Sequence, residues 1–203
     1  MTDKVFDAAF DELMKSEGGY TSNHKDPGGE TYLGVTRNNH PYCKFWKHIN
    51  IIIGQLGDYP TEQKAMLGYN AKVNKYMQEN CPEARDEGAM VFKVSYWDRC
   101  RCNEMPAALA VCVSDSAYNS GIKRAIEWLQ KAVGAGVDGL IGPQTLSMAN
   151  RCDKAAAIEK YSEARIEFLK KSKDKNGKLL WPVFGRGWTT RVKNVEDLAR
   201  KYI

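Results

Sequence analysis

The sequence predicts a mainly α protein, folded as two helical lobes with one small β-hairpin. Apolar residues recur at helical spacing over residues 3–16, and helical patterns dominate from residue 105 onward. Between them, residues 20–36 are poor in helix formers and rich in Gly, Thr, Tyr and Asn, which favours strands and turns. No repeat, low-complexity segment or clean linker interrupts the chain. We therefore expect lobes at residues 1–100 and 101–203 that pack on each other.

The first predicted helix ends beside a carboxylate. Gly18 and Gly19 follow Glu17 and supply the left-handed exit that commonly ends a helix. Glu17 would then lie near the negative end of the helix dipole, which raises the pKa of a carboxyl group. A carboxyl group that stays protonated can act as a general acid.

A glycine-rich turn follows. The sequence Asp-Pro-Gly-Gly at positions 26–29 predicts a turn, and residues 31–36 have strand-like composition. A hairpin here would place Asp26 and Thr31 on its arms or tip, facing Glu17. Asp26 can be an ordinary turn residue or the second carboxylate of a glycosidic site. Cleavage of a glycosidic bond needs such a pair, because one acid protonates the leaving oxygen while the other positions or deprotonates a water.

Five residues are candidates for substrate binding. Gly28 and Gly29 permit the turn, and they would also let a sugar approach the backbone closely. Tyr20 and Tyr118 could stack on the C–H faces of pyranose rings, although aromatic side chains are also common in cores. Asn119 could hydrogen-bond an acetamido group or cap the next helix, and both interpretations stay open.

The remaining chain is expected to be helical. Residues 41–95 are mixed, with Pro60, Pro82 and residues 54–57 as interruptions. Gly142-Pro143 is a good helix start, because proline suits the first helical position. The later helices are predicted at residues 106–119, 121–133, from 143 onward, 154–172 and, as a short final one, 195–201.

Composition limits the classes of function. The chain has 203 residues and a net charge of +5, and its longest apolar run is too short to cross a bilayer. The acidic N-terminus lacks an apolar signal-peptide core, so we expect synthesis in the cytoplasm. A basic cluster could be a solvated helix end, or it could attract a polyanion such as a wall polymer or nucleic acid. Its members are Lys170, Lys171, Lys173, Lys175 and Lys178. No nucleic-acid reading motif accompanies them.

The six cysteines do not predict a disulfide scaffold or a metal site. They are sparse for a chain of this length. Cys100 and Cys102 lack a second Cys or His pair at zinc-site spacing, and no His-Glu-x-x-His motif is present. We expect free, buried thiols and neither a metal nor a cofactor.

Two blocks of sequence resemble a known enzyme family. The string Glu-Gly-Gly-Tyr at 17–20, followed by Asp-Pro-Gly-Gly-Glu-Thr at 26–31, resembles glycoside hydrolase family 108, the N-acetylmuramidases of phage endolysin type. The spacing of Glu17, Asp26 and Thr31 also resembles the Glu-Asp-Thr triad of phage lysozymes. Residues 115–121, 129–146 and 187–192 resemble that family's later motifs and its predicted peptidoglycan domain. Residues 41–92 depart from the family pattern.

The resemblance implies a lysozyme-like catalytic lobe at 1–100 and a peptidoglycan-binding lobe at 101–203. It implies hydrolysis of the β-1,4 bond between N-acetylmuramic acid and N-acetylglucosamine, with lysis of bacteria. Glu17 would be the acid, Asp26 would activate water or stabilise charge, and Thr31 would orient the water, with inversion favoured. Two alternatives stay open: a lytic transglycosylase on the same bond, and a non-catalytic wall-binding or secretion-associated protein.

The resemblance also implies a cellular setting. Peptidoglycan would be the partner, with no nucleic acid and no stable membrane insertion, and the protein would be a monomer. An endolysin waits in the host cytoplasm until a holin lets it reach the wall from the periplasm.

Overall fold

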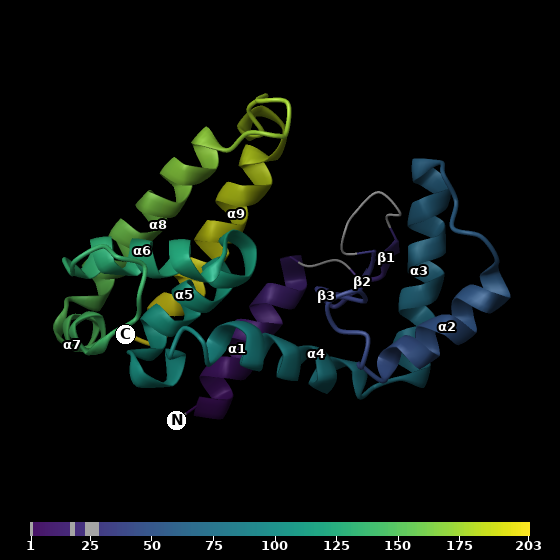
Figure 1. Cartoon of the computed structure of the whole chain (residues 1–203), viewed down its shortest axis with the longest axis horizontal. Coiled ribbons are helices and arrows are strands. Elements are labelled where there is room, and N and C mark those ends of the chain that lie inside the picture. Colours follow the sequence, from purple (N-terminus) through teal and green to yellow (C-terminus); the bar gives the residue numbers. More distant parts are fainter. Residues whose placement is uncertain (1, 17–18, 23–28) are drawn as a thin grey trace. The chain divides into compact units, whose positions relative to one another are not determined.

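The computed structural model describes residues 2–16, 19–22 and 29–203. These form a mainly helical protein with one small antiparallel sheet, as predicted (Figure 1). The chain divides into two compact units. We call Leu13–Val91 the sheet unit, and Met1–Glu12 with Phe92–Ile203 the helical unit. The lobe boundary that the sequence suggests, between residues 100 and 101, remains a prediction.

The sheet unit combines the sheet with helices from the segment at 41–92. Helix α1 (Thr2–Ser16) is divided between the two units after Glu12. The other helices of the sheet unit are α2 (Phe45–Leu56), α3 (Gln63–Asn80) and α4 (Ala84–Phe92), which ends at the boundary. The helical character expected for residues 41–95 is confirmed. Helices α2 and α3 lie side by side (Figure 1).

The sheet has three strands in chain order, β1 (Thr21–Ser22), β2 (Glu30–Tyr32) and β3 (Val35–Thr36). Residues 31–36, whose composition is strand-like, form the ends of two strands because the chain turns back at Leu33 and Gly34. Both have positive φ, 49° and 72°, as a two-residue hairpin turn requires. Gly34 adopts this conformation freely, whereas the strand-like composition around Leu33 concealed the turn.

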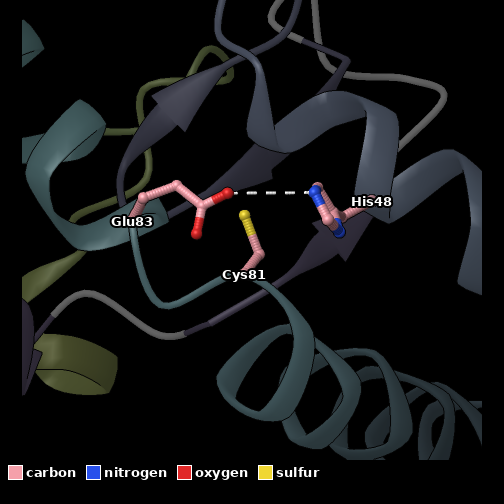
Figure 2. Close-up of side chains that lie close together, drawn as sticks. All are labelled: His48, Cys81 and Glu83. Atoms are coloured by element: carbon pink, nitrogen blue, oxygen red, sulfur yellow. Dashed lines mark ion pairs between the residues drawn. The ribbon is translucent and has the colours of Figure 1, made fainter.

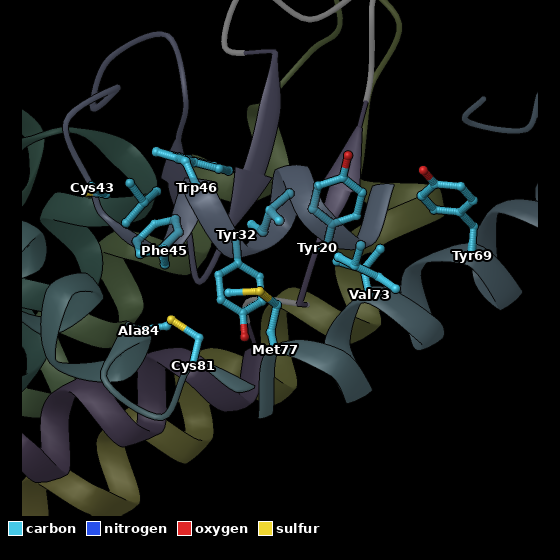
Figure 3. Close-up of a cluster of buried hydrophobic side chains, with 13 residues drawn as sticks. Tyr20, Tyr32, Cys43, Phe45, Trp46, Tyr69, Val73, Met77, Cys81 and Ala84 are labelled. Carbon is cyan, nitrogen blue, oxygen red and sulfur yellow. The ribbon is translucent and has the colours of Figure 1, made fainter. Parts of the chain in front are cut away.

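One face of the sheet closes the core of this unit. Tyr32 from β2 meets Val73 and Met77 of α3, with Phe45 and Trp46 of α2 nearby (Figure 3). The Tyr32 and Phe45 rings meet edge to face with centroids 5.5 Å apart, a preferred geometry for aromatic pairs. Burial raises the pKa of Tyr32 to about 12. The β-hairpin is therefore held by side chains of the helices rather than by its few ladder bonds.

The helical unit is built on a central buried helix, α5 (Ala107–Ser120). Around it lie α6 (Ile122–Val133), α8 (Lys154–Lys171) and α9 (Trp181–Arg200), each of which contacts α5. Helix α7 (Pro143–Arg151) packs on α6. These bounds confirm the predicted helices to within a residue or two.

The last helix is much longer than the sequence predicts. The sequence predicts only a short final helix at residues 195–201, whereas α9 also takes in Pro182, Gly185 and Gly187. In the structure, Pro182 occupies the first turn, where its missing N–H costs nothing. A Cβ at Gly185 would lie 2.7 Å from the Trp181 ring. This glycine therefore lets the indole pack on its own helix, and packing outweighs its low helix propensity.

The structure also tests the expectation of free cysteines. All six cysteines are free thiols, five of them buried, as predicted. Among the described residues, none of the helices has the length and apolar character that a bilayer crossing requires.

Candidate functional site

Thr31 is the member of the predicted catalytic triad that the structure describes. Glu17 and Asp26 lie outside the described residues, as does Gly28 of the predicted substrate-binding set. Thr31 stands in the central strand β2, opposite Thr21 of β1 and Thr36 of β3.

Cross-strand partners share one face of a sheet. The three threonines therefore form a row on the face opposite buried Tyr32. Thr31 is half-buried there, so this row stays within reach of solvent.

The segment that follows Glu17 is anchored to α3. The backbone N–H of Tyr20 donates to Asn74 Oδ1 at 2.6 Å. Gly19 makes this contact possible, because a Cβ there would lie 2.0 Å from the same oxygen. Asn74 thus fixes where the chain enters strand β1.

We expect Gly19→Ala to destabilise the protein by about 1–3 kcal/mol, because the added methyl displaces Asn74 and strands the Tyr20 N–H. Thermal unfolding followed by circular dichroism measures this. Gly68→Ala on α3 is the matched control, since nothing lies within 4 Å of a Cβ there. It should stabilise the helix by about 0.5–1 kcal/mol. Equal melting temperatures for the two variants would contradict the anchoring role of Asn74.

Glu30 is the centre of a polar network on the sheet. The Tyr20 hydroxyl donates to Glu30 Oε1 at 2.6 Å, and Arg37 Nε lies 2.5 Å from Oε2. The Arg37 guanidinium also covers the Trp46 ring at 4.4 Å, a cation–π contact. Burial and the Glu30 carboxylate raise the pKa of Tyr20 far above its usual range. Tyr20 therefore stays protonated and holds Glu30 in a fixed position.

A cleft of about 700 Å³ opens beside this network. Its walls come from the sheet, from the end of α2 and from the start of α3. They carry two carboxylates, Glu30 and Asp58, and three tyrosine rings, Tyr20, Tyr59 and Tyr69. The remaining lining residues are Ser22, Gly29, Arg37, Asn38, Asn50, Ile53, Gly54 and Gly57.

The tyrosines of the cleft support one another. The Tyr59 and Tyr69 rings meet edge to face with centroids 5.1 Å apart, and Tyr20 lies 6.3 Å from Tyr59. The Tyr69 hydroxyl donates to the Gly57 carbonyl at 2.9 Å. Hydroxyls, carboxylates and ring faces together are the groups that bind a saccharide.

Two of the predicted substrate-binding residues, Tyr20 and Gly29, line this cleft. Tyr20 is largely buried, so its ring is mainly a core element and its hydroxyl acts through Glu30. Gly29 has a φ of +67°, and a Cβ there would lie 3.2 Å from the Asn38 amide. The turn geometry therefore explains this glycine by itself.

Tyr118 and Asn119 belong to the helical unit. The Tyr118 ring packs on Tyr96 with centroids 5.2 Å apart. Asn119 Nδ2 donates to the Asp115 carbonyl of its own helix at 2.9 Å. It does not cap α6, whose N-cap residue is Gly121 and has no side-chain cap. Of the two interpretations of Asn119, the capping one is therefore wrong.

Asn119 lines a smaller pocket, of about 340 Å³, among α5, α6, α8 and α9. Three arginines line it as well: Arg124, Arg165 and Arg191. Two of these bind Asp115, which is buried at the centre of the unit. Arg165 Nη1 lies 2.6 Å from Asp115 Oδ2, and Arg191 Nη2 lies 2.8 Å from Oδ1. Asp115 thus joins three helices through two ion pairs.

Comparison with protein families shows to which family the chain belongs. The glycosyl hydrolase 108 family matches residues 10–121, more than half of the chain. The chain belongs to this family. A second match, to the predicted peptidoglycan domain, covers residues 124–193. A glycosyl hydrolase 108 protein with such a domain is a glycoside hydrolase that acts on peptidoglycan.

A solved structure agrees with this assignment. The structure of Brucella abortus SagA is similar to this glycosyl hydrolase 108 protein with a TM-score of 0.59 and 26% sequence identity. The match covers 99% of this chain and 97% of SagA, and the mainly α, lysozyme-like fold predicted from sequence is confirmed. No curated protein sequence matches the chain.

The loop that resembles peptidoglycan-binding motifs is held in this glycosyl hydrolase 108 protein by one buried glutamine. Gln130 Nε2 donates to Asp138 Oδ1 at 2.6 Å and to the Leu140 carbonyl at 3.0 Å. Its Oε1 accepts from the N–H groups of Asp138 and Gly139 at 3.0 and 2.9 Å. Most motif residues therefore shape the loop, while Leu140 remains exposed on it.

Gln130→Leu keeps the size of the side chain but leaves two loop N–H groups without a partner. We expect a loss of about 2–4 kcal/mol in unfolding free energy, since each stranded buried group costs about 1–3 kcal/mol. Denaturant unfolding measures the loss. Amide exchange at Asp138 and Gly139 should quicken more than exchange in α8. Unchanged exchange in the loop would show that Gln130 does not hold it.

The sequence did not reveal several residues of the cleft. Arg37 and Asp58 carry no motif, and Asn74 reaches its partner from 54 positions away. Glu30 is part of the motif Asp-Pro-Gly-Gly-Glu-Thr, but the sequence does not show its contacts with Tyr20 and Arg37. Its position as an acidic residue directly before Thr31 was the signal that could have identified it.

Proposed function

We propose that this protein is an N-acetylmuramidase that hydrolyses the β-1,4 bond between N-acetylmuramic acid and N-acetylglucosamine. The observation that carries the proposal is the family match over residues 10–121, which contains Glu17, Asp26 and Thr31. Tyr20 and Glu30, which lie between these residues in sequence, line the cleft of about 700 Å³. Thr31 does not line it, because its side chain lies on the other face of the sheet.

The proposed mechanism needs two carboxyl groups and one water. Glu17 donates its proton to the glycosidic oxygen as the bond to C1 of muramic acid breaks. Asp26 takes a proton from the attacking water, or stabilises the positive charge on the sugar, and Thr31 orients that water. The products are a new reducing end and a free hydroxyl on the leaving sugar. Inversion requires room for the water between the acids, a separation of about 6.5–9.5 Å.

The contacts of Glu30 support a positioning role for this residue in the proposed mechanism. Glu30 is already bound by the Tyr20 hydroxyl and by Arg37, so it is a poor candidate for the proton donor. Its bonds instead fix β2, the strand that carries Thr31, relative to the chain that follows Glu17.

A lytic transglycosylase is the first competing function. It would use the same glutamate on the same bond but close the muramic acid on itself, so that Asp26 would be dispensable. Its products would carry 1,6-anhydro ends instead of reducing ends. The presence of both Asp26 and Thr31 in the family's spacing favours hydrolysis.

The second competing function is that of a non-catalytic wall-binding or secretion-associated protein. It would bind sacculi without releasing fragments. The glycoside hydrolase family match disfavours it.

The cellular role that we propose is that of an endolysin, a monomer made in the host cytoplasm that reaches the wall from the periplasm after a holin acts. This rests on the family resemblance. The five lysines of the basic cluster are exposed, from the last turn of α8 into the following loop. They suit an anionic wall polymer.

Digestion of purified sacculi separates the three functions. The wild-type protein should release soluble muropeptides whose new ends are reducing by mass spectrometry. Anhydro ends would indicate a transglycosylase. Bound protein without soluble fragments would indicate a wall-binding protein.

A further inference from the structure

Three potential metal ligands meet in the sheet unit. His48 comes from α2, Cys81 follows the last residue of α3, and Glu83 precedes the first residue of α4. Their side chains point toward one another (Figure 2). The His48 Nε2 to Glu83 Oε1 distance is 3.9 Å, and all three ligand atoms lie within 4.8 Å of one another.

We propose that His48, Cys81 and Glu83 form a binding site for a divalent transition-metal ion, with Zn²⁺ as the preferred ion. The sulfur, imidazole nitrogen and carboxylate oxygen are the three kinds of ligand that protein zinc sites use. A hard cation such as Mg²⁺ or Ca²⁺ would prefer a set of oxygens, which this site does not supply.

The spacing of the three atoms suits a tetrahedral ion. Zinc–ligand bonds of about 2.0–2.3 Å place neighbouring ligand atoms roughly 3.4–3.6 Å apart. The His48 to Glu83 distance is 3.9 Å, and no two of the three ligand atoms are more than 4.8 Å apart. Side-chain movements of up to roughly 1.4 Å would therefore bring them to the spacing of a zinc site. On binding, the thiol proton of Cys81 leaves to solvent and the thiolate becomes the ligand.

The exposure of the three side chains would leave the fourth coordination position of the ion to water. Cys81 is buried at the floor of the site, whereas the Glu83 side chain is 55% exposed and that of His48 is 29% exposed. An ion held here would be open on the carboxylate side. It would join α2 to the turn between α3 and α4, whose helices build the core beneath the sheet.

The same residues also interact without an ion. The Cys81 thiol hydrogen-bonds the Glu83 carboxylate, which lies near His48 and Lys44. A structural cluster of this kind would be indifferent to zinc, and the experiment must separate the two.

The test titrates the purified full chain, stripped with a chelator, with Zn²⁺ or Co²⁺ as the only added metal. Calorimetry should show one site per chain. Co²⁺ should give a thiolate-to-metal charge-transfer band, which Zn²⁺ displaces. Zn²⁺ should also raise the melting temperature, because it binds the folded chain.

Three variants locate the site. Cys81→Ser should abolish the charge-transfer band. His48→Ala, which changes a less buried position, should weaken binding by at least about 100-fold, since even residues behind a metal ligand are worth 10–100-fold. Cys43→Ser removes another buried thiol of the same unit and should bind as the wild type does. If Cys81→Ser fails to fold, His48→Ala decides.

Two outcomes would overturn the proposal. One is the absence of a Co²⁺ thiolate band at stoichiometric metal. The other is a His48→Ala variant that binds as tightly as the wild type, which would place the metal elsewhere, for instance at Cys100 and Cys102. Neither outcome depends on whether the protein cleaves peptidoglycan.

Discussion

Glu17→Gln should lower the rate of peptidoglycan hydrolysis by about 10²–10⁴-fold, the usual contribution of a general acid. Glutamine has nearly the same shape but cannot donate a proton to the glycosidic oxygen. The rate is followed as turbidity loss of permeabilised Gram-negative cells. The melting temperature should stay close to that of the wild type, because glutamine keeps the size and polarity of the side chain.

Glu12→Gln is the matched control, since it makes the same chemical change within α1. It should lyse cells at nearly the wild-type rate. Normal lysis by Glu17→Gln would remove Glu17 from the catalytic role. Equal loss in both variants would point to the stability of α1 instead.

The second large effect is expected at Asp115. Asp115→Asn removes the negative charge that pairs with buried Arg165 and partly buried Arg191. Breaking a buried ion pair costs about 3–5 kcal/mol. For a chain of this size each kcal/mol lowers the melting temperature by about 2–4 °C. We therefore expect the helical unit to melt well below the wild-type temperature, as measured by circular dichroism.

Asp98→Asn is the control for this substitution. Its partner Lys93 lies 2.7 Å away, but both side chains are 41% exposed, and such surface pairs contribute about 0–1 kcal/mol. Equal destabilisation by the two variants would show that burial does not strengthen the Asp115 cluster.

The stabilisation by Asp115 also depends on pH. Burial opposes the charge of this carboxylate, but Arg165 and Arg191 outweigh burial and lower its pKa below the usual range. The unfolded chain therefore binds the proton more readily. The stabilisation is complete above the unfolded pKa of about 3.9 and is lost as pH falls through the folded pKa. The stability difference between wild type and Asp115→Asn should shrink accordingly below about pH 4.

Local patterns were enough to predict most helices. The apolar spacing before Glu17 predicted α1, and Gly142 with Pro143 predicted the start of α7. These features depend on residues a few positions apart, where periodicity and capping act. The same local rules failed at Leu33, where a tight turn interrupts strand-like residues, and at Gly185, which helix α9 tolerates because Trp181 packs on it.

The contacts that build the cleft were beyond such patterns. Asn74 binds the Tyr20 backbone across 54 positions, and Arg37 reaches both Glu30 and the Trp46 ring through the folded sheet. His48 and Cys81 likewise come together only when α2 and α3 pack. None of these residues stands in a sequence motif that would identify its partner. The partner is brought near only by tertiary packing.

In the proposed reaction, water cleaves the muramic acid bond with Glu17 as the acid. The direct measurement digests purified sacculi in water labelled with heavy oxygen, followed at once by borohydride reduction and mass spectrometry. We predict one heavy oxygen at each new muramic acid end, and release that is about 10²–10⁴-fold slower for Glu17→Gln with an intact fold. Unlabelled anhydro ends, or labelled ends released equally by Glu17→Gln, would contradict the account.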